Sequence, residues 1–192
     1  PDRFFARLDG SDTVPLARAL FLQILFGCGS FGVVVGSYRG GLQSFFCALK
    51  FPLLALGTLI LCAPTYLSLV HIQGVAFRAR EAVLLALGAT ARLSLVLAGL
   101  APVLWLTMGS WSYHALALAI VGAFGLAGLA AASMLFRGLA QKGVGSFAGF
   151  VLVVLYAIVG AHSAWILRPY LVRPKTESVP FVRGLEGDLL QS

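Results

Sequence analysis

The chain is a series of long apolar runs separated by short connectors, and the connectors hold most of its charged residues. A helix needs about 20 mainly apolar residues to cross the hydrocarbon core of a bilayer, because it rises about 1.5 Å per residue. Five runs approach or exceed this length: Ala19–Gly36, Phe51–Val70, Ala82–Met108, Trp111–Phe136 and Phe147–Leu167. They are continuously apolar, which favours helices over the alternating strands of a membrane β-barrel. The pattern therefore predicts an all-α fold, a polytopic membrane helix bundle with five transmembrane helices.

The same pattern divides the chain into three parts. We expect an N-terminal tail over residues 1–18, a transmembrane domain over 19–168 and a C-terminal tail over 169–192. We expect the C-terminal tail to be extended, because its prolines prevent a long helix. In an alternative topology the first run is interfacial or re-entrant, which leaves four spans.

A short polar stretch precedes the second run. We predict a separate interfacial helix over Leu42–Lys50, with its lipid side formed by Phe45, Phe46 and Leu49. The second span then starts at Phe51, because the following Pro52 is tolerated in the first turn of a helix.

Two runs carry small residues at helical spacing. In the first run, Cys28, Gly32 and Gly36 recur every fourth position and share one helical face, which permits close approach of another helix. We interpret this face as packing within the chain or, alternatively, as a surface for self-association or for another membrane subunit. In the fourth run, glycines recur at 122, 125 and 128, and we expect a tightly packed central helix.

The composition restricts the chemistry. Hydrophobic residues make up 59% of the chain and charged residues 11%, too few to cover a soluble surface of this size. Between Asp12 and Glu177 the only carboxylate is Glu81, which precedes the third run. The spans therefore lack the acidic groups that proton-coupled carriers and cation transporters use. No cluster of catalytic residue types is present either, so we expect no enzymatic activity.

The charge of the connectors predicts an orientation. The net charge is +7, and we expect the basic residues at helix ends, Arg168 among them, to contact lipid phosphates and not nucleic acid. The connector Gly109–Ser110 has no basic residue, so the positive-inside rule places it outside. The N-terminal tail and the connectors at 73–81 and 137–146 are then cytoplasmic, and five spans place the C-terminus outside. An aromatic belt is expected at the outer interface, formed by Trp105, Trp111, Tyr113, Trp165 and Tyr170.

Two polar residues lie inside the apolar runs. Gln23 needs an internal hydrogen-bond partner, and Arg92 sits at mid-depth in the third run, where it costs on the order of 3 kcal/mol. Three readings of Arg92 stay open. Its side chain snorkels to the inner headgroups, or bonds backbone carbonyls and Gln23 inside the bundle, or contacts a lipid phosphate or an acidic residue of a partner subunit.

The histidines and cysteines give weak signals for a cofactor. His114 opens the fourth run and His162 lies in the fifth, so both fall in the outer half of the membrane. This makes ligation of a haem or a chlorophyll conceivable, although hydrogen-bonded interface histidines and no cofactor are the preferred reading. Cys28, Cys47 and Cys62 have neither metal-binding nor redox spacing, and we interpret them as small core residues.

Three stretches carry a resemblance. The first runs from Gly36-Ser37 through Lys50-Phe51-Pro52-Leu53-Leu54 to Cys62-Ala63-Pro64, and the second includes Leu155–Gly160 and Ala164–Tyr170. The third is Phe181–Asp188. Together they resemble a family of poorly characterised bacterial inner-membrane proteins, which looks like the five-helix Yip (Rab-interacting) type of membrane domain. The resemblance implies an accessory or scaffolding role in the inner membrane and carries over no catalytic residues.

These features lead to three hypotheses of function. The preferred one is a non-catalytic membrane subunit, scaffold or assembly factor of a larger complex, whose partners are the lipid bilayer and other membrane subunits or further copies of the chain. The second is a small permease or lipid-handling protein that uses Arg92 to contact an anionic group. The third is a haem- or chlorophyll-binding subunit that uses His114 and His162.

Overall fold

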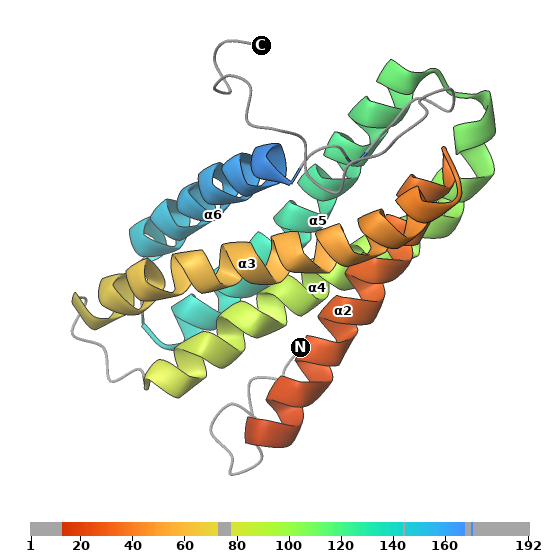
Figure 1. Ribbon diagram of the computed structural model, residues 1–192. Coiled ribbons are helices and arrows are strands. Elements are labelled where there is room, and N and C mark those ends of the chain that lie inside the picture. The colour runs from red at the N-terminus through yellow and green to blue at the C-terminus, as the bar shows by residue number, and fades with distance from the viewer. Residues whose placement is uncertain (1–12, 73–77, 144, 168–169, 171–192) are drawn as a thin grey trace.

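The structure is a computed structural model that describes residues 13–72, 78–143, 145–167 and 170. Its helices are α2 (Thr13–Ser37), α3 (Leu42–Ile72), α4 (Ala79–Thr107), α5 (Tyr113–Gln141) and α6 (Ser146–Ile166), with a short 3-10 helix η1 (Met108–Ser110) between α4 and α5 (Figure 1). No strand occurs in these residues. Five helices are long and apolar enough to span a bilayer, as in a multi-pass membrane protein. The predicted all-α bundle with five spans is thus confirmed.

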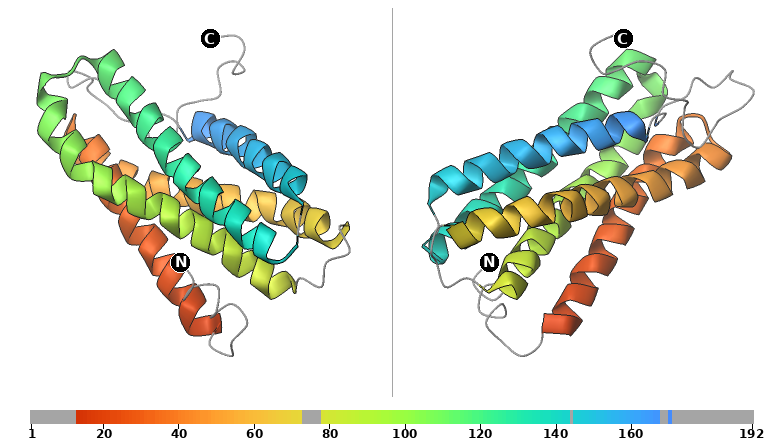
Figure 2. Two further views of the ribbon diagram at one scale, coloured as in Figure 1. Left: turned by 180° about the vertical axis from the view of Figure 1, so that it is seen from behind. Right: turned by 60° about the vertical axis from the view of Figure 1, so that its left-hand side comes forward.

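Successive helices run in opposite directions, so the bundle has two distinct ends (Figure 2). The basic end holds the N-termini of α4 and α6 and the C-terminus of α5, and its basic residues are Arg78, Arg80, Arg137 and Lys142. The aromatic end holds the C-termini of α4 and α6 and the N-terminus of α5, and its aromatic residues are Trp105, Trp111, Tyr113 and Trp165. Residues 78–81 and 137–143, described parts of two connectors predicted on the same side, therefore do lie at a common end.

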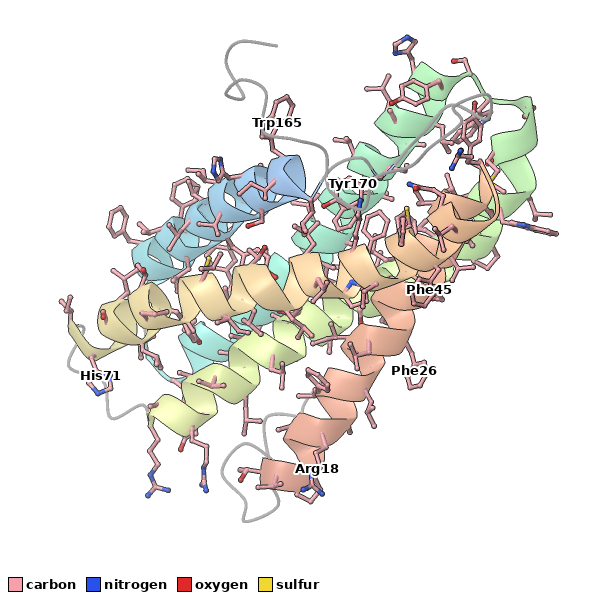
Figure 3. All side chains as sticks on the ribbon, viewed as in Figure 1. Arg18, Phe26, Phe45, His71, Trp165 and Tyr170 are labelled. Carbon is pink, nitrogen blue, oxygen red and sulfur yellow. The ribbon has the colours of Figure 1, made fainter. Side chains whose placement is uncertain are left out.

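The first helix is longer than predicted. It begins at Thr13, six residues before the expected start of the span, and so takes in Arg18. Pro15 fits this start, because a proline in a first turn lacks only an N–H that has no partner there. Arg18 is exposed near the end of the helix and needs no internal partner, so it does not stop the helix (Figure 3).

Close contact between backbones joins α2 to α3 and α4. A Cβ atom added at Gly36 would lie 2.5 Å from the Cα atom of Ser44, and one added at Gly32 would collide with the carbonyl of Cys47. On the α4 side, a Cβ atom at Gly27 would lie 2.7 Å from the carbonyl oxygen of Ser94. Only glycine allows these approaches. The glycine face of α2 is therefore occupied within the chain.

The predicted division between an interfacial helix and a second span is wrong. Leu42–Ile72 is one continuous helix of 31 residues, with Pro52 and Pro64 inside it. Proline is tolerated inside a membrane helix where neighbouring groups compensate for the lost hydrogen bond. Of the three residues predicted on the lipid side, Phe45 and Leu49 are exposed, at 65% and 44%, and Phe46 is half-buried. Figure 3 shows Phe45 on the outside of the helix. At 1.5 Å per residue the helix is about 46 Å long and exceeds the ~30 Å hydrocarbon core.

The central helix is α4, and the prediction that the fourth run is tightly packed and central is wrong. α4 contacts α2, α3 and α5, whereas α5 packs mainly on α4. The buried stripe of α5 consists of Leu116, Ile120, Ala123 and Ala127. An added Cβ atom at Gly122, Gly125 or Gly128 would meet nothing within 4 Å. These three glycines lie off the buried stripe, whereas Gly138, near the end of α5, is buried against Leu85. Glycine spacing alone therefore did not identify the packed face.

Candidate functional site

The most unusual group of side chains is a set of buried polar residues on α3 near the aromatic end. Gln43, Cys47 and Lys50 are 1%, 0% and 0% exposed. Their spacing of four and then three residues places them on one face of the helix. We call these three residues the α3 socket. Lys50 was predicted to lie at the membrane interface, but the structure buries it inside the bundle.

Tyr170, which follows α6, fills the α3 socket (Figure 3). Its backbone carbonyl oxygen accepts hydrogen bonds from Gln43 Nε2 at 2.8 Å and from Cys47 Sγ at 3.1 Å. The Lys50 Nζ atom lies 5.7 Å from the centroid of the Tyr170 ring, within the range of a cation–π contact. Burial raises the pKa of the Tyr170 hydroxyl above its usual value, so the phenol stays neutral.

Aromatic rings from three helices surround this contact. The Tyr170 ring lies 5.1 Å from that of Phe51 on α3, measured between centroids. Phe51 stacks on Phe124 of α5 at 5.5 Å and meets Phe31 of α2 edge-to-face at 5.6 Å. Such ring pairs add specific packing to the apolar contact. Tyr170 therefore packs on Phe51 of α3, whose ring in turn contacts α2 and α5.

The side chains of the α3 socket are suited to binding a hydrogen-bond acceptor. It offers an amide N–H, a thiol and an ammonium, all of which donate to oxygen atoms. The described residues contain no group of three His, Cys, Asp or Glu side chains able to hold a metal ion. This site was not predicted from the sequence, because polar residues such as Gln43 and Lys50 are typical of a helix at the membrane surface. The polar spacing within an otherwise apolar helix was the signal that could have revealed it.

Arg92 lies halfway along α4 and is half-buried. Gln23 does not bond it, because the Gln23 amide donates to the carbonyl of Ala91 at 3.1 Å. This confirms the internal partner expected for Gln23. Within the described part of the chain, the Arg92 side chain makes neither a hydrogen bond nor an ion pair. The readings that stay open for Arg92 are snorkelling, a lipid phosphate and a partner subunit.

The other residues predicted to contact lipid, a partner or a cofactor do not lie together in one site. Gly32 and Gly36 face α3 of the same chain, as described above, and Arg168 lies outside the described residues. His114 and His162 are exposed on α5 and α6 near the aromatic end. The His114 ring meets that of Tyr113 edge-to-face at 5.6 Å. Among the described contacts, none joins the two histidines to each other, so the structure does not assemble them into a ligand pair.

The single carboxylate among the connectors has a structural partner. Glu81 is 5% exposed, and its Oε2 atom lies 3.0 Å from Lys142 Nζ. This ion pair joins the first turn of α4 to the residue after α5 at the basic end. A carboxylate in a first turn also interacts favourably with the helix dipole. The ion pair and the helix dipole thus give the Glu81 carboxylate a structural role in the fold.

Comparisons of the chain with family models, with curated proteins and with solved structures find no match. The resemblance to the Yip type of membrane domain therefore stays a prediction.

Proposed function

We propose that the chain is a non-catalytic integral membrane subunit that serves as a scaffold or assembly factor in a larger membrane complex. The observation that carries this proposal is the uneven packing of the five helices. In the most apolar 18-residue stretch of α2, α3 and α4, 44–50% of the residues are buried. In the same stretch of α5 and α6, only 11% of the residues are buried. Two of the five helices thus bury few residues fully, and most of their residues are at least partly accessible to lipid or to another membrane helix.

The open side of α5 is suited to a helix as well as to lipid. Gly122 and Gly125 are exposed, with large apolar neighbours such as Val121 and Leu126 that are 68% and 59% exposed. Association of helices in lipid depends on close packing and not on the hydrophobic effect, and small residues permit that packing. The occupant that this proposal requires is a transmembrane helix of a partner subunit.

A pair of matched variants tests the proposal. Leucine at Gly122 and Gly125 fills the open side of α5, so we expect a complex purified in mild detergent to lose its partner subunit. Gly99→Leu is the control, because Gly99 of α4 is also exposed and an added Cβ atom there would meet nothing within 4 Å. Native mass spectrometry of both preparations gives the composition. A partner-free parent chain, or equal loss in both variants, would contradict the proposal.

We also propose that the chain lies in a bacterial inner membrane with its N-terminus in the cytoplasm. The support is the asymmetry of the ends. Arg78, Arg80, Arg137 and Lys142 lie at the basic end, and the η1 connector at the aromatic end carries no basic residue. The positive-inside rule assigns the basic end to the cytoplasm.

A second candidate function is binding of an anionic lipid, and Arg92 is the observation that favours it. This guanidinium is half-buried at mid-length of α4 without a partner in the described residues. We expect Arg92→Leu to weaken binding of phosphatidylglycerol in nanodiscs by tenfold or more, and Arg92→Lys to retain most of it, because lysine keeps the charge. Equal binding by the parent and Arg92→Leu would exclude this role.

A further inference from the structure

The hydrogen bonds at Tyr170 belong to a longer line of contacts between α6 and α3. Leu152 of α6 lies in the same buried cluster as Tyr66 and Val70 of α3. Further along, the Tyr156 hydroxyl donates to the carbonyl oxygen of Ala55 at 3.2 Å. From Leu152 to Tyr170 the contacts move overall toward the N-terminus of α3, so α6 runs antiparallel to α3.

The contact between Tyr170 and the α3 socket continues this antiparallel pairing beyond the end of α6. Gly160 faces Thr58, and Tyr170 then reaches Gln43 and Cys47 at the start of α3. The aromatic end of α6 has little other support, since contacts between α5 and α6 are few and few residues of α6 are fully buried. In lipid, the hydrophobic effect does not press such a helix onto its neighbours. Hydrogen bonds and ring packing must hold it.

We propose that the α3 socket is a docking site for Tyr170, and that Tyr170 locks the end of α6 onto the bundle. The socket recognises Tyr170 by its backbone carbonyl and its aromatic ring. The donors are fully desolvated, and a buried donor without an acceptor is unfavourable. Releasing Tyr170 therefore leaves Gln43 and Cys47 without this acceptor and uncovers the thiol.

Protection of Cys47 tests the lock. The full-length protein is prepared with Cys28 and Cys62 replaced by alanine, and alkylation of Cys47 by N-ethylmaleimide is followed by mass spectrometry. We expect Tyr170→Ala to raise the alkylation rate at least tenfold. His162→Ala is the matched control, because His162 lies on α6 but is exposed, and it should leave the rate unchanged. An unchanged rate in Tyr170→Ala, or an equal rise in His162→Ala, overturns the proposal.

Two further measurements separate release of the lock from loss of the fold. In a chain that keeps only Cys28, which is 0% exposed in the core, Tyr170→Ala should leave the thiol protected. If Cys28 also reacts, the variant has unfolded and photo-crosslinking decides. p-Benzoylphenylalanine at position 170, which keeps an aromatic ring, should crosslink to α3 on irradiation, whereas the same residue at the exposed position 162 should give no crosslink to residues 43–51. Absence of a crosslink from position 170 to α3 overturns the proposal.

Discussion

At the scale of single residues, the same residue type has opposite roles in different helices. Gly32 and Gly36 bring the backbone of α2 against that of α3, so no side chain fits between them. Gly57 of α3 is also helical, but an added Cβ atom there would meet nothing within 4 Å. The spacing in the first run indicated a packed face correctly. The same reasoning failed in the fourth run, because a pattern of glycines does not specify whether another helix lies opposite.

Substitution of these glycines by alanine should give contrasting results. Gly32→Ala places a methyl group against the Cys47 carbonyl, which is rigid backbone, and overpacking of this kind costs about 1–3 kcal/mol. We expect the free energy of unfolding to fall by that amount. Gly57→Ala should leave it unchanged or raise it by up to ~1 kcal/mol, because alanine is the better helix former. Reversible unfolding in detergent with increasing SDS, followed by circular dichroism, measures both. A fall at Gly57 equal to that at Gly32 would contradict the packing described for α2.

At the scale of elements, the helices were predictable and the burial of α3 was not. The third, fourth and fifth runs match α4, α5 and α6 closely, because apolar length is a local property. The start of α3 contains Gln43 and Lys50, and polar residues in a sequence are normally placed at a surface. Here their desolvation is compensated by Tyr170, which follows them by more than a hundred residues. A partner so distant in the sequence is invisible to a local pattern.

Continuity of α3 can be measured directly. In single spin-label variants over positions 42–53, we expect high accessibility to oxygen at 42, 45, 49 and 53 and low accessibility at 43, 47 and 50. The reason is that Leu42, Phe45, Leu49 and Leu53 are exposed on one side while the α3 socket is buried on the other. The period of about 3.6 residues should run through Pro52 without a change of phase. A break in phase at 50–51 would instead support a separate interfacial helix.

At the scale of the whole molecule, the bundle is asymmetric in two directions. From side to side, α2, α3 and α4 form the packed part, and α5 and α6 bury few of their residues fully. From end to end, basic side chains are concentrated at one end and tryptophans at the other. The difference between the two ends was predictable, because charged and aromatic residues in connectors can be read directly from the sequence. The difference in packing between the helices was not predictable, because the five runs are similarly apolar and only the tertiary contacts distinguish them.

The end-to-end asymmetry predicts the orientation in the cell. Ser110 and Gln141 are exposed residues at the aromatic and basic ends, respectively, and each is replaced by cysteine in a chain free of native cysteines. We expect a membrane-impermeant maleimide to label Ser110→Cys in intact spheroplasts and Gln141→Cys only after permeabilisation. The reason is that basic connectors are retained in the cytoplasm. The cysteine-free chain gives the background. Labelling of Gln141→Cys in sealed spheroplasts, with Ser110→Cys protected, would mean the opposite orientation, and the tryptophans would then mark the cytoplasmic interface.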